Sequence, residues 1–530
     1  MKQRKTSINP YVGVATLLLV ASIQQNAFAL EPMKIGDVDV GTITGYARVG
    51  ATWNLQDHPE PDFANPGKTL EGRGELSMLR ETIQLQYVNA NLPTFLPNQS
   101  AFTMVGRLVK ESRTTYLKRL DASAQANGAP GSFMDHYNTN RESIREAYLD
   151  LPFSKRVSLR FGKQQVIWGE TDLLQAMDII NPRDVSWNAP GLEPEDEDLR
   201  QPLIMANLNV SVPEWDGSLQ LLYRPGWDNE TQLGTTLDLF SGRFAAQPTK
   251  GAFFPLKYNY HHSNGDTDDA SYGFRWSGVT KSQASYSLAY YHSVDSTPVL
   301  NVSAPGVVTP YKGSIGVPGG VGAELILPEF DLIGGTLNTY IQPFDLVFRT
   351  EASFTKDKAY NAESALGGAL APTIMEKNTV KVMVGFDKQF ALMDTLGTDS
   401  ASMWTVQLFD SWIPGFDAND RLLDGPGATA HLKAHSVTLV SSFGLSYNNN
   451  QIQPGVTLVA STSYGSGLII PSVNLLFGDH WRLLVNGVFF FPGMLGGCST
   501  QPDGTGANCT HGFAAYDNNN QLGARLTYQF

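Results

Sequence analysis

The sequence is poor in cysteine, in charged residues and in long apolar runs. Two cysteines in 530 residues exclude a disulfide-rich scaffold. Charged residues make up only 17%, and Lys and Arg number 38 against 51 Asp and Glu. Without a net positive field, a protein that binds nucleic acid is excluded as the first interpretation. After residue 30 there is no uninterrupted run of about 18 apolar residues, which excludes a membrane protein built from many helices.

Glycine and proline are plentiful instead, with 50 and 30 residues, and they disfavour a bundle of long helices. Hydrophobic residues make up 42%, which is too many for a disordered chain. The remaining classes are a large soluble β-protein and an outer-membrane β-barrel.

The first residues have the pattern of a secretory signal peptide. Lys2, Arg4 and Lys5 precede a short apolar stretch at 12–23, and Ala27-Phe28-Ala29 offers the small-x-small cleavage pattern. We expect cleavage after Ala29, which leaves residues 30–530 as one domain; an uncleaved membrane anchor is the alternative.

Export also places the two cysteines in an oxidising compartment. Cys498 and Cys509 are therefore expected to form a disulfide, with free thiols as the alternative.

The C-terminus alternates as a membrane β-strand does. Every second residue from Leu522 to Phe530 is apolar or small, whereas Arg525, Thr527 and Gln529 lie on the other face. A strand of a transmembrane barrel places its apolar residues towards lipid and its polar residues towards a water-filled lumen. The chain also ends on an aromatic residue, as bacterial outer-membrane barrels do. This ending and the leader favour the barrel over a soluble sandwich.

Repetition of this pattern predicts an all-β transmembrane antiparallel barrel of about 18 strands, with 16 as the alternative. The expected strands begin near residues 41, 77, 100, 142, 156, 203, 217, 270, 283, 333, 346, 378, 402, 433, 451, 468, 481 and 518. Short connections, such as 152–155, 213–216, 279–282, 447–450 and 479–480, fall on the periplasmic side in this order. The long connections 112–140, 168–202, 226–269, 294–332 and 492–517 fall outside, as in known barrels.

Residues 142–202 hold the most distinctive motifs: REAYLDLP, RFGKQ, WGETD and DIINPRD. Together with Arg200-Gln201-Pro202 and the strand around Phe348-Arg349-Thr350-Glu351, they resemble an uncharacterised family of proteobacterial outer-membrane barrels, known only as a domain of unknown function. The resemblance implies an outer-membrane pore. It also implies periplasmic or inner-membrane exporter partners and passage of hydrophobic compounds.

The long connection 168–202 is expected to fold into the lumen as a constriction, because a loop of that length needs a role. Its acidic residues, including a run at 193–198, would face basic side chains of the wall and create a transverse field. The alternative is that these charges only hold the loop against the wall. The candidate constriction residues are Arg160, Lys163, Gln164, Trp168, Glu170, Asp172, Asp178, Asn181, Arg183, Asp184, Arg200, Arg349 and Glu351.

The favoured function is therefore a pore for small solutes in the outer membrane, in contact with lipid. We expect no enzyme activity, cofactor, metal site or nucleic-acid partner. A hydrolase on a barrel scaffold is an alternative, but the sequence has no G-x-S-x-G nucleophile motif. A structural or adhesive barrel whose loops bind a partner is another. A receptor with a plug domain is disfavoured, because strand alternation begins by about residue 42.

Overall fold

The structure is a computed structural model. It describes residues 33–35, 38–57, 62–90, 92–93, 95–126, 143–183, 199–228, 257–259, 270–303, 311–312, 322–364, 368–424, 431–491, 513 and 519–530. Among these residues, no helix combines the length and apolar character needed to cross a membrane.

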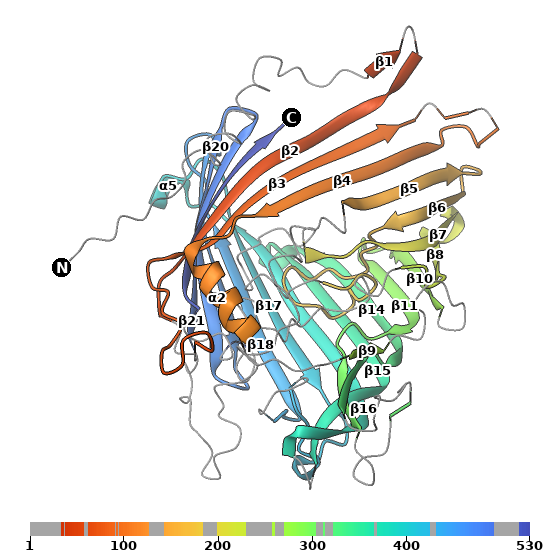
Figure 1. The fold of residues 1–530 in the computed structure, drawn as a ribbon. Helices are drawn as coiled ribbons and strands as arrows, with labels where there is room; N and C mark the ends of the chain where they lie inside the picture. Colours follow the sequence, from red (N-terminus) through yellow and green to blue (C-terminus); the bar gives the residue numbers. More distant parts are fainter. Residues whose placement is uncertain are drawn as a thin grey trace.

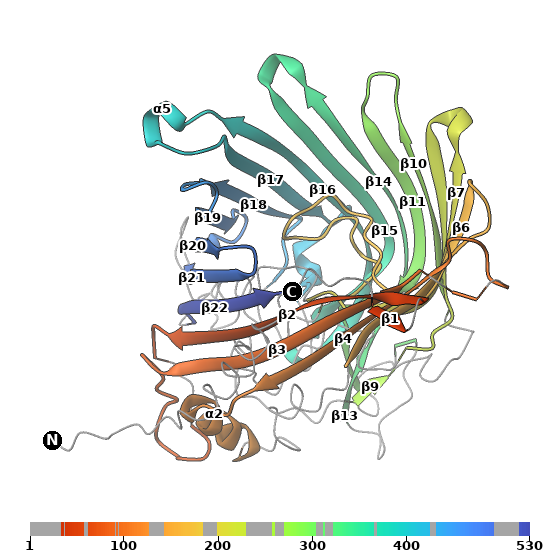
Figure 2. The same cartoon turned by 90° about the horizontal axis from the view of Figure 1, so that it is seen from above.

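Eighteen of the described strands form one closed antiparallel barrel, seen from two directions in Figures 1 and 2. Each strand pairs with its neighbour in the sequence of barrel strands, and the last strand pairs with the first, which leaves no free edge. The barrel strands are β2 (Val38–Asn54), β3 (Leu76–Asn89), β4 (Ala101–Glu111), β5 (Ile144–Pro152), β6 (Val157–Gln164), β7 (Leu203–Val212), β8 (Gly217–Arg224), β10 (Ser271–Val279), β11 (Ser285–Val294), β14 (Glu329–Ile341), β15 (Leu346–Ser364), β16 (Gly368–Phe390), β17 (Ser402–Trp412), β18 (His435–Gly444), β19 (Ile452–Ser461), β20 (Ser466–Phe477), β21 (Trp481–Phe491) and β22 (Gln521–Gln529).

Alternation along the strands separates an apolar outside from a polar inside. In β11, Leu288 is 62% exposed, whereas the adjacent Ser287 is 5% exposed and bonds to Thr336 of β14 at 2.8 Å. Large apolar side chains such as Ile333 and Val384 are likewise exposed on the outer face. An apolar belt of this kind is stable only against lipid. The closed barrel therefore has the fold of an outer-membrane β-barrel, as the alternation predicts.

The two rims differ in the length of their connections. The backbone of Phe530 exchanges two hydrogen bonds with Gly45, each of 3.0 Å, so the chain ends at the rim where β2 begins. Short turns lie at this terminal rim, among them 153–156, 213–216 and 478–480, as expected. Two of them are 3₁₀ turns, η2 (Pro213–Trp215) and η4 (Gln342–Phe344), each followed by an aspartate in the left-handed conformation.

The strand positions agree with the sequence to within a few residues, with one clear exception. β16 begins at Gly368 rather than near 378, so the β15–β16 hairpin extends further at the rim opposite the chain terminus. A β-bulge after Thr355 interrupts the pairing of β15 with β16, and the polar residues beyond it hide the alternation.

Further elements lie outside the barrel pairing. β1 (Met33–Ile35) pairs only with β2. Helix α2 (Thr115–Ala126) follows β4, and the short α5 (Met393–Leu396) lies between β16 and β17; a third 3₁₀ turn, η5 (Ala418–Asp420), lies between β17 and β18. β9 (Lys257–Asn259), β12 (Val299–Ser303) and β13 (Gly322–Ile326) form a separate sheet of three strands.

Candidate functional site: a segment inside the barrel

The connection after β6 turns into the barrel. We call its described part, residues 165–183, the inner segment. Figure 2 shows the inner segment as an ochre trace within the ring of strands, beside β15. Strand register places the side chains that hold it, such as Gln220, Glu351 and Gln407, on the inner face of β8, β15 and β17. The inner segment therefore lies against the wall within the lumen.

A buried tryptophan anchors the first part of the inner segment. The Trp168 side chain is almost fully buried, and its Nε1 donates a hydrogen bond to Gln220 Oε1 at 2.8 Å. Its ring meets Tyr291 edge-on, with 5.7 Å between ring centroids. Gly273 of β10 makes this approach feasible, because a Cβ there would lie 3.2 Å from the Trp168 ring and 2.7 Å from Tyr291. The apolar packing and the hydrogen bond together fix the position of the segment on β8 to β11.

The central attachment is the carboxylate of Glu351 on β15. It is fully buried and accepts hydrogen bonds from the backbone N–H groups of Glu170 and Met177, the latter at 2.9 Å. Two residues further along β15, Ser353 Oγ donates to the carbonyl of Ala176 at 3.1 Å. Backbone groups of an irregular segment need partners when they leave water. Glu351 and Ser353 supply these partners from the barrel wall.

Arg349 lies on the same face of β15 and gathers two carboxylates. Its guanidinium donates to Asp172 at 3.1 Å and to Asp387 of β16 at 2.7 Å, and also to the carbonyl of Glu170 at 2.6 Å. Gln407 of β17 completes the contact, since its Nε2 donates to Asp172 at 3.0 Å. These charges thus hold the segment directly to the wall.

An apolar patch on the inner wall receives the far end of the segment. Leu173, Leu174 and Ala176 pack on it. Register places the wall residues of the patch on the inner faces of adjacent strands β16 to β21. They are Met383, Phe409, Val440, Val459, Leu468, Val488 and Phe490. Apolar side chains facing a lumen are unfavourable in water, and the inner segment removes them from it.

The last part of the segment returns to the strands from which it started. Asp178 forms a buried ion pair with Arg200, and Arg183 lies 3.7 Å from the same carboxylate oxygen. Asn181 Nδ2 donates to the carbonyl of Gln164 at 3.2 Å. These contacts close the segment onto the residues that lead into β6 and β7.

The remaining candidates from the sequence fall in different places. Arg160 on the inner face of β6 pairs with Asp150 at 2.7 Å and does not contact the inner segment. Gln164 is fully buried and donates to the carbonyl of Met205 at 3.0 Å. Alternation places Lys163 on the outer face of β6, where its Nζ donates to the carbonyl of Ile144 at 3.0 Å. Asp184, the acidic run at 193–198, Cys498, Cys509 and residues 1–29 lie outside the described residues.

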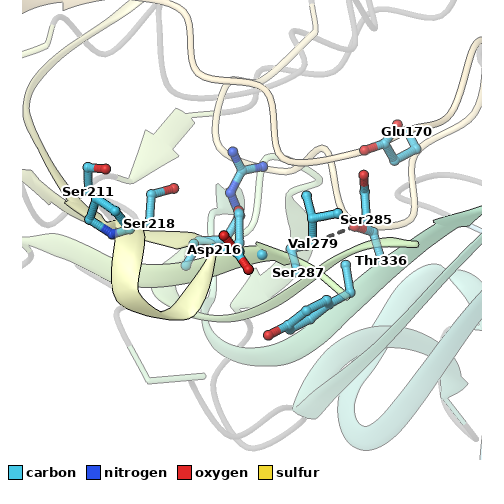
Figure 3. A pocket seen from close by; sticks show the side chains of 14 residues that line it. Glu170, Ser211, Asp216, Ser218, Val279, Ser285, Ser287 and Thr336 are labelled. Atoms are coloured by element: carbon cyan, nitrogen blue, oxygen red, sulfur yellow. Dashed lines mark hydrogen bonds between the residues drawn. The ribbon is translucent and has the colours of Figure 1, made fainter. Parts of the chain in front are cut away.

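A recess of about 500 Å³ lies beside Glu170, between the inner segment and the wall near the terminal rim (Figure 3). Arg275 of β10 is the basic residue that lines it, and Glu170 and Asp216 are the acidic ones. Six serine and threonine side chains from β7, β8, β10, β11 and β14 also line it, and register places all six on the inner face: Ser211, Ser218, Ser277, Ser285, Ser287 and Thr336.

Sequence reasoning did not select Arg275, Ser353, Asp387 or Gln407. Each is a polar residue at an inward position of a strand, so alternation identifies its face. The strand pattern contains no signal for the partner of such a residue, because the partner lies up to 235 residues away. The apolar inner patch was missed for a different reason: Val440 and Val459 follow the alternation poorly, since both faces of these strands are apolar there.

A protein-family model described as "Protein of unknown function (DUF1302)" matches residues 10–530. The chain belongs to the DUF1302 family. This match confirms the family that the motifs of residues 142–202 indicated, and it covers nearly the whole chain. Comparison of this DUF1302 member with curated protein sequences gives no match.

Several solved structures are similar to the DUF1302 chain at low identity. OmpF of Salmonella typhi, in complex with daunomycin, aligns with 94% of this chain and 100% of its own (10% identity, TM-score 0.40). OccAB1 of Acinetobacter baumannii aligns with 93% of this chain and 96% of its own (9% identity, TM-score 0.43). OpdK of Pseudomonas aeruginosa, with vanillate, aligns with 92% of this chain and 98% of its own (8% identity, TM-score 0.40). The assignment of the barrel in this DUF1302 chain rests on its own closed strand pairing.

Proposed function

We propose that this protein is a diffusion channel of the outer membrane, in which the inner segment narrows a water-filled lumen for small solutes. The observation that supports it is the attachment of the inner segment to Glu351 inside a closed barrel of 18 strands. A barrel of this strand number is wide enough to leave an aqueous channel. A segment held across part of that width by buried hydrogen bonds restricts passage without closing the barrel. No covalent step is required.

The chemistry of the wall favours polar and charged solutes over the hydrophobic compounds that the family resemblance suggested. The buried apolar patch on the inner faces of β16 to β21 is covered by Leu173 and Leu174, so a passing solute does not contact it. Register places Arg48, Arg482 and Arg525 on inward positions of β2, β21 and β22, which are neighbours in the ring. Asp172 on the inner segment keeps 53% of its side chain exposed. Separated charges of opposite sign around a lumen orient polar solutes as they pass.

Conductance in planar lipid bilayers tests the proposal. We expect the purified full-length barrel to produce stepwise ionic currents. Replacement of residues 169–179 by a short glycine linker should increase the size of each step, because the constriction is removed while the strands stay intact. A folded barrel that inserts but carries no current in either orientation contradicts the proposal. Equal step sizes for the two proteins contradict the assignment of the constriction to the inner segment.

A further inference from the structure

We propose that the recess beside Glu170 is a binding site for a small hydroxylated carboxylate of the sugar-acid class, with Arg275 as the residue that binds the carboxylate. The inference rests on the proposed channel function, since it names the solute class that the channel would select. Figure 3 shows the recess, with hydroxyl side chains along the wall and Glu170 on the inner segment above them.

Arg275 forms no ion pair within 4 Å in the part of the chain that the structure describes. The acidic group that acts on its charge there is Glu170, which borders the same recess. Arg275 Nη1 reaches only the carbonyls of Ile167 and Trp168, at 3.3 and 3.5 Å, and its Nε has no hydrogen-bond partner. Arg349, three strands further around the ring on β15, is instead occupied by two carboxylates. Nε is buried, so the terminal nitrogens of the guanidinium are the donors that Arg275 can offer an incoming anion.

The ring of Trp168 holds the Arg275 guanidinium in place. The guanidinium carbon lies 5.8 Å from the centroid of the buried Trp168 ring, a cation–π arrangement that orients the group without neutralising it. Trp168 is itself fixed by its bond to Gln220. A planar guanidinium in a fixed orientation binds a carboxylate through two parallel hydrogen bonds, which is the strongest common geometry for this anion.

The rest of the recess offers hydrogen-bonding groups for a polyol. The hydroxyls of Ser211, Ser218, Ser277 and Ser285 can donate to or accept from the hydroxyls of a solute, the Ser287–Thr336 pair keeps acceptor capacity, and the carboxylate of Glu170 accepts from such hydroxyls. Glu170 and Asp216 also disfavour a dianion such as phosphate, because two negative groups border a site with one arginine. A volume of about 500 Å³ lies in the range of known small-molecule sites and accommodates a hexose ring with some water.

The experiment measures binding of D-glucuronate to the detergent-solubilised full-length barrel by calorimetric titration, with D-glucose and benzoate as comparison solutes. Glucose lacks the carboxylate and benzoate lacks the hydroxyls. We expect glucuronate to bind more tightly than either. Arg275→Gln should weaken glucuronate binding by about tenfold, because hydrogen bonds to a charged group are lost.

Arg156→Gln is the matched control, since it removes the same charge at the same rim from an exposed side chain that pairs with Glu214 at 2.7 Å. It should leave binding unchanged. Ser277→Val is a second variant that keeps Arg275, and it should weaken glucuronate binding but not benzoate binding. The heat-dependent shift of the folded band on a gel confirms that each variant is a folded barrel.

The outcomes separate this inference from the channel proposal when conductance is recorded on the same preparations. Glucuronate binding that is equal in wild type and Arg275→Gln, or reduced as much by Arg156→Gln, overturns the inference even if the protein conducts. Binding that depends on Arg275 supports the inference, and if no conductance accompanies it, the channel proposal alone fails.

Discussion

The carboxylate of Glu351 accepts a hydrogen bond from the backbone N–H of Met177 at 2.9 Å, although 174 residues separate the two in the chain. The same carboxylate accepts the N–H of Glu170, so one wall residue holds both the outgoing and the returning half of the inner segment. Glu351 is one of several attachments, but its side chain can be changed without disturbing the strand pairing, so its contribution can be measured by itself.

Glu351→Ala should loosen the inner segment while leaving the barrel intact. Each hydrogen bond to a charged acceptor contributes about 1.5–3 kcal/mol, so the two amides should exchange hydrogen at least tenfold faster. Hydrogen–deuterium exchange of peptides covering 165–183 measures this. Glu376→Ala is the control, because this exposed glutamate contacts Lys312 and Tyr311 instead. Equal protection of the segment in wild type and Glu351→Ala contradicts the role assigned here.

Arg349→Gln should shift the ion selectivity towards cations. The substitution removes a positive charge from the inner face and leaves Asp172 and Asp387 without their shared partner. The stability cost through Asp172 should stay below about 1 kcal/mol, because half of that side chain is in water and the pair is screened. The reversal potential in a KCl gradient measures the shift. An unchanged potential, or an equal shift in Arg156→Gln, would show that Arg349 does not face the conducting water.

Leu174→Asp should release the part of the inner segment around Leu174 from the apolar patch. A charged side chain does not pack on the apolar patch, and loss of the apolar contact costs about 1–3 kcal/mol. Limited proteolysis should then cut within 165–183 while the barrel strands stay resistant. Leu174→Met conserves the volume and serves as the control. Resistance of the aspartate variant to cleavage would indicate that the patch does not hold the segment.

A new charge should lower the stability of the barrel on its outer face but not on its inner face. Leu288→Arg places a charge on the outer, lipid-facing side of β11, and such a change destabilises membrane barrels by about 2–4 kcal/mol near the middle of the bilayer. Ser442→Arg places the same charge at an inward position of β18, where water solvates it. Urea unfolding in lipid vesicles should show a loss for the first variant alone. A comparable loss for both would contradict the assignment of faces.

Two expectations from the sequence concern residues outside the described part of the chain. Cleavage after Ala29 and a bond between Cys498 and Cys509 predict a mature protein that begins at Leu30 and contains no free thiol. Intact mass spectrometry and thiol titration of the unreduced protein test both. A closed loop of about 12 residues contributes roughly 3 kcal/mol in the loop-entropy model. One reactive thiol per cysteine would exclude the bond, and retention of Met1 would exclude cleavage.

Strand positions were predictable because they follow from a local pattern. The expected starts at 203, 217, 346, 402 and 481 coincide with the first residues of β7, β8, β15, β17 and β21. The start of β16 was wrong by ten residues, since Pro372 and the polar run Glu376-Lys377-Asn378 obscure the alternation in its first half.

Alternation along each strand thus determined, from the sequence alone, the face of most strand residues, because side-chain direction in a β-strand depends only on position along it. The leader and the terminal Phe530 then favoured a barrel over a soluble sandwich with the same alternation. Only the tertiary structure decided which inward residues meet. The sequence suggested that acidic residues of the connection face basic residues of the wall, without saying which of them pair, and the structure brings Asp172 and Arg349 into direct contact. The structure likewise brings Arg275 and Glu170 to the same recess. Such contacts join residues far apart in the chain, and their pairing depends on how the inner segment folds back against the wall.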